Sequence, residues 1–143
     1  MVGLFIQGCL PFVGAPASLR AWAKQIGLPE APEQAEKAFL HGAPGQVFDG
    51  SNDLGKFVLV SSNDGLCSVV TDKASTAALT SALEAGLRRE EMAFRLVIER
   101  DDKSVKSIHN REYLAARKGK GWRILEATVT DGEGQAMLTA GPE

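Results

Sequence analysis

The stretch that decides the fold is KFVLVSSNDGLCSVV, residues 56–70. Four consecutive apolar residues at 57–60 are followed by the triplet NDG at 63–65 and by a second strand-like run that begins near Cys67. Asn, Asp and Gly tolerate the backbone angles of tight turns, so the stretch predicts an antiparallel hairpin. Its first strand is apolar on both faces. That indicates a central strand covered on two sides, or a hairpin strand in a thick core.

Two helices are predicted before the hairpin. Residues 18–26 carry apolar side chains at helical spacing, with Ser18 as the expected N-cap. Residues 32–41 follow, with Pro32 in the first turn and Gly42 after the last. We expect residues 1–15 to form a loose segment that is tethered to the fold through Cys9.

A third helix is predicted over 73–88, capped by Thr71 or Asp72, and strands are predicted over 46–51, 93–101, 105–117, 121–131 and 134–140. The order is α-α-β-β-β-α-β-β-β-(β), and the short connections favour antiparallel pairing. The sequence therefore predicts one α+β domain over 1–143. It would be an antiparallel sheet of about five to seven strands with helices packed on one face.

Composition limits the function. The chain has 143 residues, a formal net charge of −2 and 6% aromatic residues, which disfavours nucleic acid as a partner. No stretch reaches the length of a transmembrane helix. Phosphate-loop, dinucleotide-binding and nucleophile-elbow motifs are absent from the sequence, so we expect no cofactor and no recognisable catalytic residue.

Cys67 and Cys9 leave several interpretations open. A catalytic thiol needs a base nearby, and a metal site needs more ligands at regular spacing; the sequence indicates neither. An even number of cysteines suits a Cys9–Cys67 disulfide, and two buried free thiols are the alternative. A disulfide would imply a compartment outside the cytoplasm.

Several segments together resemble a family of small secreted bacterial proteins with no assigned activity. They are GCLPFV (8–13), LRAWAKQIGLP (19–29), FLHGAPGQVFDGSN (39–52), KFVLVSSNDGLCSVV (56–70), HNREYLAAR (109–117) and GQAMLTAGPE (134–143). The resemblance implies a signal peptide, export to the periplasm or the medium, and a bridge between Cys9 and Cys67. This chain shows no complete signal peptide, because its apolar run at 2–6 is short and no basic residues precede it. We expect that the leader has been removed.

His109, Arg111 and Tyr113 form the densest polar cluster on a predicted strand, and alternation places them on one face. Together they could bind an anion or a carboxylate. The alternative is a solvated sheet face with cross-strand ion pairs, for instance with Arg123 or Glu126 opposite.

Trp122 and Arg123 follow a cationic turn at 117–120 that could contact a phosphate or a polar partner. The alternative for this turn is a charged hairpin tip that resists aggregation.

The sequence favours a small exported non-catalytic domain that binds an unidentified protein or small ligand through its sheet face or a loop. An inhibitor or immunity-type protein is one version of this hypothesis. Two other hypotheses are an enzyme with an unrecognised site near His109, Arg111 and Tyr113, and a protein that uses Cys67 as a reactive thiol.

Overall fold

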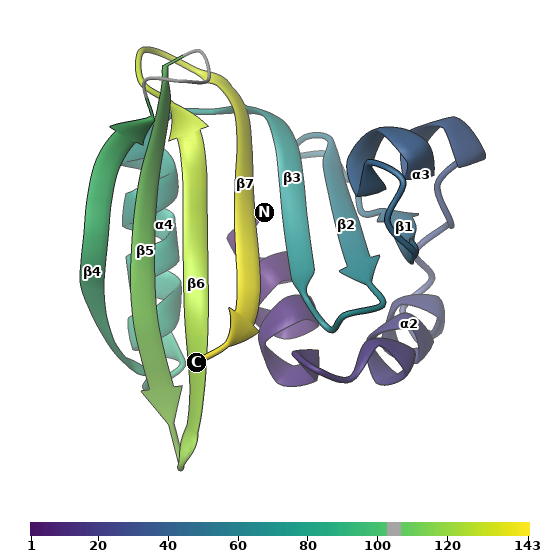
Figure 1. Cartoon of the computed structure of the whole chain (residues 1–143), viewed down its shortest axis with the longest axis horizontal. Coiled ribbons are helices and arrows are strands. Elements are labelled where there is room, and N and C mark those ends of the chain that lie inside the picture. The colour runs from purple at the N-terminus through teal and green to yellow at the C-terminus, as the bar shows by residue number, and fades with distance from the viewer. Residues whose placement is uncertain (103–106) are drawn as a thin grey trace.

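The computed structural model describes residues 1–102 and 107–143, and these form an α+β fold built on one antiparallel sheet (Figure 1). Seven strands run in the order β1-β2-β3-β7-β6-β5-β4. They are β1 (Gly45–Asp49), β2 (Phe57–Ser62), β3 (Cys67–Ala74), β4 (Ala93–Asp102), β5 (Ile108–Arg117), β6 (Lys120–Val129) and β7 (Gly134–Pro142). The predicted fold class is confirmed. Residues 105 and 106 of the predicted strand 105–117 lie outside the described residues.

The helices that the sequence predicts form in the predicted order, and three short helical segments that it does not predict precede them. In chain order, the helical segments are α1 (Val2–Leu4), the π-helical η1 (Phe5–Cys9), the 3₁₀ turn η2 (Leu10–Phe12), α2 (Pro16–Gln25), α3 (Glu33–Leu40) and α4 (Thr76–Arg89). In Figure 1, α4 lies behind β4, β5 and β6, and the N-terminal turns lie behind β7 and β3. α4 connects β3 to the far edge strand β4, and the chain then returns through β5, β6 and β7 to pair with β3.

The hairpin between β2 and β3 forms as predicted. Its turn is closed by a hydrogen bond from the Gly65 amide to the Ser62 carbonyl at 3.1 Å. Gly65 has a φ of +97°, and a Cβ there would lie 2.9 Å from the Gly14 Cα. A side chain at this position would therefore clash with the backbone of the N-terminal segment. It would also impose a strained backbone conformation on its own residue.

Strand β2 is covered on both faces, as its uninterrupted apolar run indicates. Phe57 and Leu59 belong to the main core, together with residues of η1, α2, α4 and the other strands. Val60 belongs to a smaller cluster on the opposite face, where Phe39 and Leu40 of α3 pack against it. α3 thus packs on the face opposite α2 and α4, so the expectation that the helices lie on one face of the sheet is wrong for α3.

Two predicted helix starts are wrong. α2 begins at Pro16 with Ala15 as its N-cap, so Ser18 lies inside the helix, because proline is favoured in the first helical turn. α4 is capped by Ser75, whose side chain accepts a hydrogen bond from the Ala78 amide at 3.2 Å. Residues 71 and 72, the caps expected from the sequence, belong instead to β3, whose pairing with β7 continues to residue 74.

The expectation of a loose segment over 1–15 is also wrong for residues 2–12. These residues form α1, η1 and η2, and the side chains of Phe5, Cys9 and Leu10 are buried in the main core. Ile6 packs closely on α4, since a Cβ at Gly86 would lie 2.6 Å from the Ile6 Cδ1 atom. The apolar side chains at 2–6 are part of the core, which orders the segment.

Candidate functional site

The predicted cluster of His109, Arg111 and Tyr113 lies on the face of β5 that α4 covers. Cross-strand pairing brings Glu99 of β4 and Glu126 of β6 to either side of Arg111. We use the name polar layer for the side chains that meet here between α4 and the sheet. They are Thr80, Glu84, Glu99, Asp101, His109, Arg111, Tyr113 and Glu126.

Arg111 is at the centre of the polar layer, and its side chain is only 15% exposed. The guanidinium pairs with Glu99 and lies 3.5 Å from a carboxylate oxygen of Glu84 and 3.6 Å from one of Glu126. Its Nε donates a hydrogen bond to the Tyr113 hydroxyl at 3.1 Å. Arg111 therefore stands among three carboxyl groups.

Glu126 is a buried carboxyl group, with its side chain fully covered. Both of its oxygens lie within hydrogen-bond distance of the Thr80 hydroxyl, at 2.9 and 3.0 Å. Burial raises the pKa of Glu126, while the Thr80 hydrogen bond and the charge of Arg111 oppose that rise. The group therefore holds a proton to higher pH than an exposed glutamate does.

Tyr113 is buried, and its hydroxyl donates to Glu84 at 2.9 Å. Burial raises the pKa of Tyr113 to about 12, so it remains a neutral phenol at physiological pH.

His109 is held between two carboxylates of the neighbouring strand β4. Its Nδ1 lies 2.7 Å from Asp101 and its Nε2 lies 2.9 Å from Glu99. The hydrogen bonds to Asp101 and Glu99 raise the pKa of His109, which favours the imidazolium form with both nitrogens as donors. Neither ring nitrogen is then available to accept a proton from a substrate.

The side chains of the polar layer form hydrogen bonds and ion pairs with one another. Among the described residues, every buried side-chain nitrogen or oxygen has a hydrogen-bond partner. Two hollows among the described residues, of about 370 and 820 Å³, are lined by other side chains. Of the two cross-strand ion pairs expected as the alternative, the structure forms the one between Arg111 and Glu126, but the expected solvated face is wrong, because α4 covers these side chains. This arrangement suits the joining of α4 to the sheet better than it suits chemistry on a substrate.

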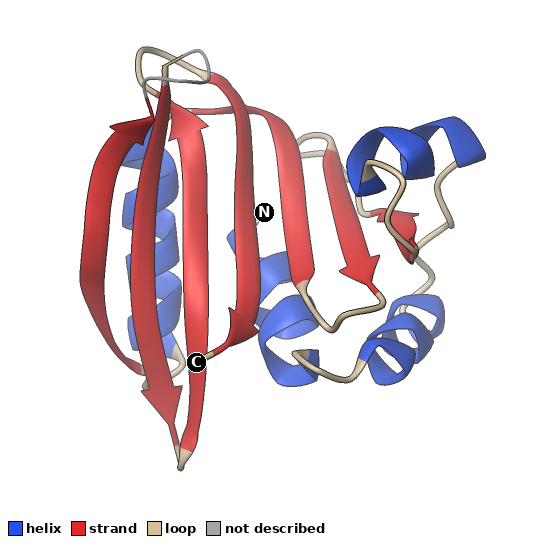
Figure 2. Cartoon of the chain, in the orientation of Figure 1, coloured by secondary structure: helices blue, strands red, loops and turns tan. Residues whose placement is uncertain are grey.

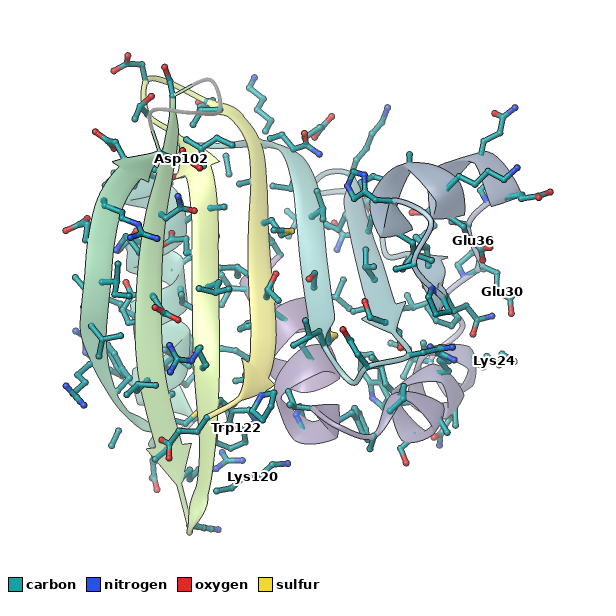
Figure 3. The ribbon with its side chains drawn as sticks, in the orientation of Figure 1. Lys24, Glu30, Glu36, Asp102, Lys120 and Trp122 are labelled. Atoms are coloured by element: carbon teal, nitrogen blue, oxygen red, sulfur yellow. A yellow bond between two sulfur atoms is a disulfide. The ribbon has the colours of Figure 1, made fainter. Side chains whose placement is uncertain are left out.

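Trp122 and Arg123 do not join this cluster. Trp122 is buried on the helix side of β6, where its indole N–H donates to the Leu10 carbonyl at 2.7 Å. Figure 3 shows it beside Lys120, whose Nζ lies 5.3 Å from the centre of the Trp122 ring system. Arg123 points to the other side of the sheet and pairs with Glu112 at 2.5 Å. The five residues predicted from the sequence therefore do not form one site.

The Cys9–Cys67 disulfide is present, with both cysteines buried and their Cα atoms 5.2 Å apart. It joins η1 to the first residue of β3, so it fixes the N-terminal turns against the sheet. Both sulfurs are in the bridge, which leaves no thiol for catalysis. Among the described residues, no three side chains of the metal-binding types gather into a group that could hold a metal ion. No helix in the described part of the chain has the length and hydropathy to cross a bilayer.

The side of β4–β7 opposite α4 forms what we call the open face. Figure 2 shows α4 behind β4–β6 and the N-terminal turns behind β7, and none of the described helices lies in front of these strands. Pairing across the strands places three exposed apolar side chains there: Ile98, Leu125 and Met137, each about 40% exposed. The charged side chains of this face are Arg95, Arg100, Glu112, Arg123 and Asp102.

Two signals could have revealed the polar layer from the sequence. Thr80 and Glu84 recur at helical spacing beside the apolar stripe of α4, so this helix presents polar side chains to the sheet as well. Glu99 and Asp101 alternate on β4, opposite Arg111 and His109 of β5, which is a cross-strand charge pattern.

Comparison of the chain with protein-family models, with curated proteins and with solved structures finds no significant match.

Proposed function

We propose that this protein is an exported, non-catalytic domain that binds a protein partner through the open face of its sheet. The observation that carries the proposal is the presentation of Ile98, Leu125 and Met137 on a face that the described helices leave uncovered. Exposed apolar side chains that gather on one face are typical of interaction surfaces.

The polar layer favours binding over catalysis. His109, Arg111 and Tyr113 are the residues on which an enzymatic site would depend, and their polar atoms contact each other or neighbouring carboxylates. A general base needs a free acceptor within reach of a bound substrate, and His109 between Asp101 and Glu99 does not offer one.

The charges of the open face indicate the chemistry of the partner. Arg95, Arg100 and Arg123 lie near the apolar side chains, and Glu112 pairs with Arg123. A partner with an apolar centre and an acidic rim would complement this surface. An inhibitor or immunity-type protein is a specific form of this proposal.

The disulfide supports export. Buried disulfides persist in oxidising compartments and are rare in the cytoplasm, where thiols are kept reduced. Alkylation of denatured protein taken directly from its native cells tests this part. We expect no adduct without reductant and two after reduction. Two adducts without reductant would contradict export.

Site-specific photo-cross-linking tests the open face. A photoreactive amino acid at position 125 should give a discrete adduct with one protein in the native cells, and the same amino acid at position 54 should not. Leu54 is the matched control because it is an exposed leucine on a loop outside the open face, beside residues of α4. The purified partner should then bind wild type and Leu54→Lys equally, and Leu125→Lys at least tenfold more weakly. Equal adducts at both positions, or equal binding by both lysine variants, would refute the proposal.

A further inference from the structure

One of the two hollows lies on the same side of the sheet as α4, away from both the open face and the polar layer. It is a half-open hollow of about 370 Å³, bounded by η1, η2, α2 and the adjoining ends of β5 and β6. Its apolar wall includes Leu10, Trp22, Met92 and Trp122. The volume falls within the range of small-molecule sites, which are commonly lined by apolar and aromatic side chains with few polar groups.

The polar side chains that line the hollow are Gln7, Glu90 and Arg117. Arg117 lines it, and its Nη1 donates to the Glu90 carbonyl at 3.1 Å and lies 3.4 Å from the Glu90 carboxylate. The Arg117 side chain is 40% exposed, so it is accessible from solvent. Lys120 lies over the Trp122 ring and adds a second positive charge beside the first. A guanidinium has five N–H donors, so an incoming carboxylate can accept from the nitrogens that Glu90 does not occupy.

The aromatic walls are fixed before any ligand arrives. The Trp122 indole N–H is bonded to the Leu10 carbonyl, and the ring of Trp22 packs so closely on Gly8 that a Cβ there would lie 2.8 Å away. The disulfide at Cys9 holds the same segment against the sheet. A preformed wall lowers the entropy that binding must remove.

We propose that this hollow binds a small amphipathic carboxylate, with its apolar body against Trp22 and its carboxylate on Arg117. The available volume of about 370 Å³ equals that of about a dozen water molecules. The site is independent of the open face, so either proposal can fail without the other.

Intrinsic fluorescence tests the proposal directly, because the chain has two tryptophans and both line the hollow. Titration with decanoate should give a saturable change in emission below its critical micelle concentration, and decanol should bind at least tenfold more weakly. Arg117→Gln should weaken decanoate binding at least tenfold, whereas Arg123→Gln, on the open face, should leave it unchanged. Leu125→Lys should also leave it unchanged, which separates this site from the open face.

A second variant keeps the test valid if Arg117→Gln alters stability. Gln7 is exposed at the edge of the hollow, so Gln7→Phe should fill part of it and weaken binding while the melting temperature stays near that of wild type. The proposal is overturned if decanoate gives no saturable change, if decanol binds equally well, or if the Arg117 and Arg123 variants bind decanoate alike.

Discussion

Removal of Arg111 should show how strongly the polar layer contributes to stability. Arg111→Met deletes the cation that stands among Glu84, Glu99 and Glu126, and keeps most of the aliphatic length. A buried ion pair that loses one partner typically costs 3 to 5 kcal/mol, because the remaining charge is left uncompensated. The Glu126 side chain is fully covered here, but Glu84 and Glu99 are 24% and 41% exposed, and Glu126 can take up a proton. We therefore expect the lower end of that range, about 3 kcal/mol at pH 7.

The loss should depend on pH. Burial already raises the pKa of Glu126, and without Arg111 that pKa must rise further. Over the pH range in which the variant holds one proton more than wild type, each unit of decreasing pH reduces the difference by about 1.4 kcal/mol. The cost of Arg111→Met should consequently fall by about 1 to 2 kcal/mol between pH 7 and pH 5.

Urea unfolding followed by tryptophan fluorescence, with the disulfide intact, measures both effects. Arg88→Met is the matched control: Arg88 also pairs with Glu84, but its side chain is 66% exposed, and such pairs contribute about 0.5 kcal/mol. If Arg111→Met costs no more than Arg88→Met at pH 7, the polar layer is not the buried electrostatic unit described here. A cost that is the same at both pH values would contradict the role given to Glu126.

Three further predictions concern other parts of the fold. Cys9→Ala together with Cys67→Ala opens a loop of 58 residues and should lower the free energy of unfolding by about 4 kcal/mol by the loop-entropy relation, measured by urea unfolding. Because the folded pKa of Glu126 is raised, its contribution is most favourable below the unfolded pKa and is lost as pH rises through the folded pKa. As the pH rises from about 4 to about 8, Glu126→Gln should therefore become progressively more stable relative to wild type in thermal melts. A stability of Glu126→Gln relative to wild type that falls as the pH rises would be contrary evidence. Gly8→Ala should push against the Trp22 ring, cost about 1 to 3 kcal/mol and shift the emission spectrum, whereas an unchanged spectrum would argue against the close packing.

The sequence was most informative where local and long-range signals agree. The turn residues at 63–65 and the apolar run before them predict the hairpin, because both its chemistry and its burial are local properties. The predicted N-caps of α2 and α4 are wrong because residue type alone does not locate a cap, and Ser18, Thr71 and Asp72 are all of types that commonly cap helices. The pairing of β3 with β7, which decides where α4 begins, depends on residues some 65 positions away.

The site was harder to predict for a related reason. Alternation correctly placed His109, Arg111 and Tyr113 on one face, but it could not show which face α4 would cover. That information depends on the crossover between β3 and β4 and on polar side chains of the helix itself. The hollow near Trp122 could not be predicted from the sequence either, since it forms only when residues 6–11 pack beside the beginning of β6.

The strand order has a consequence for how the protein is assembled. β1–β3 and β4–β6 are two three-stranded meanders, and every hydrogen bond of the sheet that joins them passes through β7. Because β7 follows all the other strands in the chain, the two meanders emerge from the ribosome with unpaired inner edges on β3 and β6. Such edges recruit other strands, so we expect the nascent chain to depend on a chaperone, or on rapid passage to its destination, until β7 is available to close the sheet.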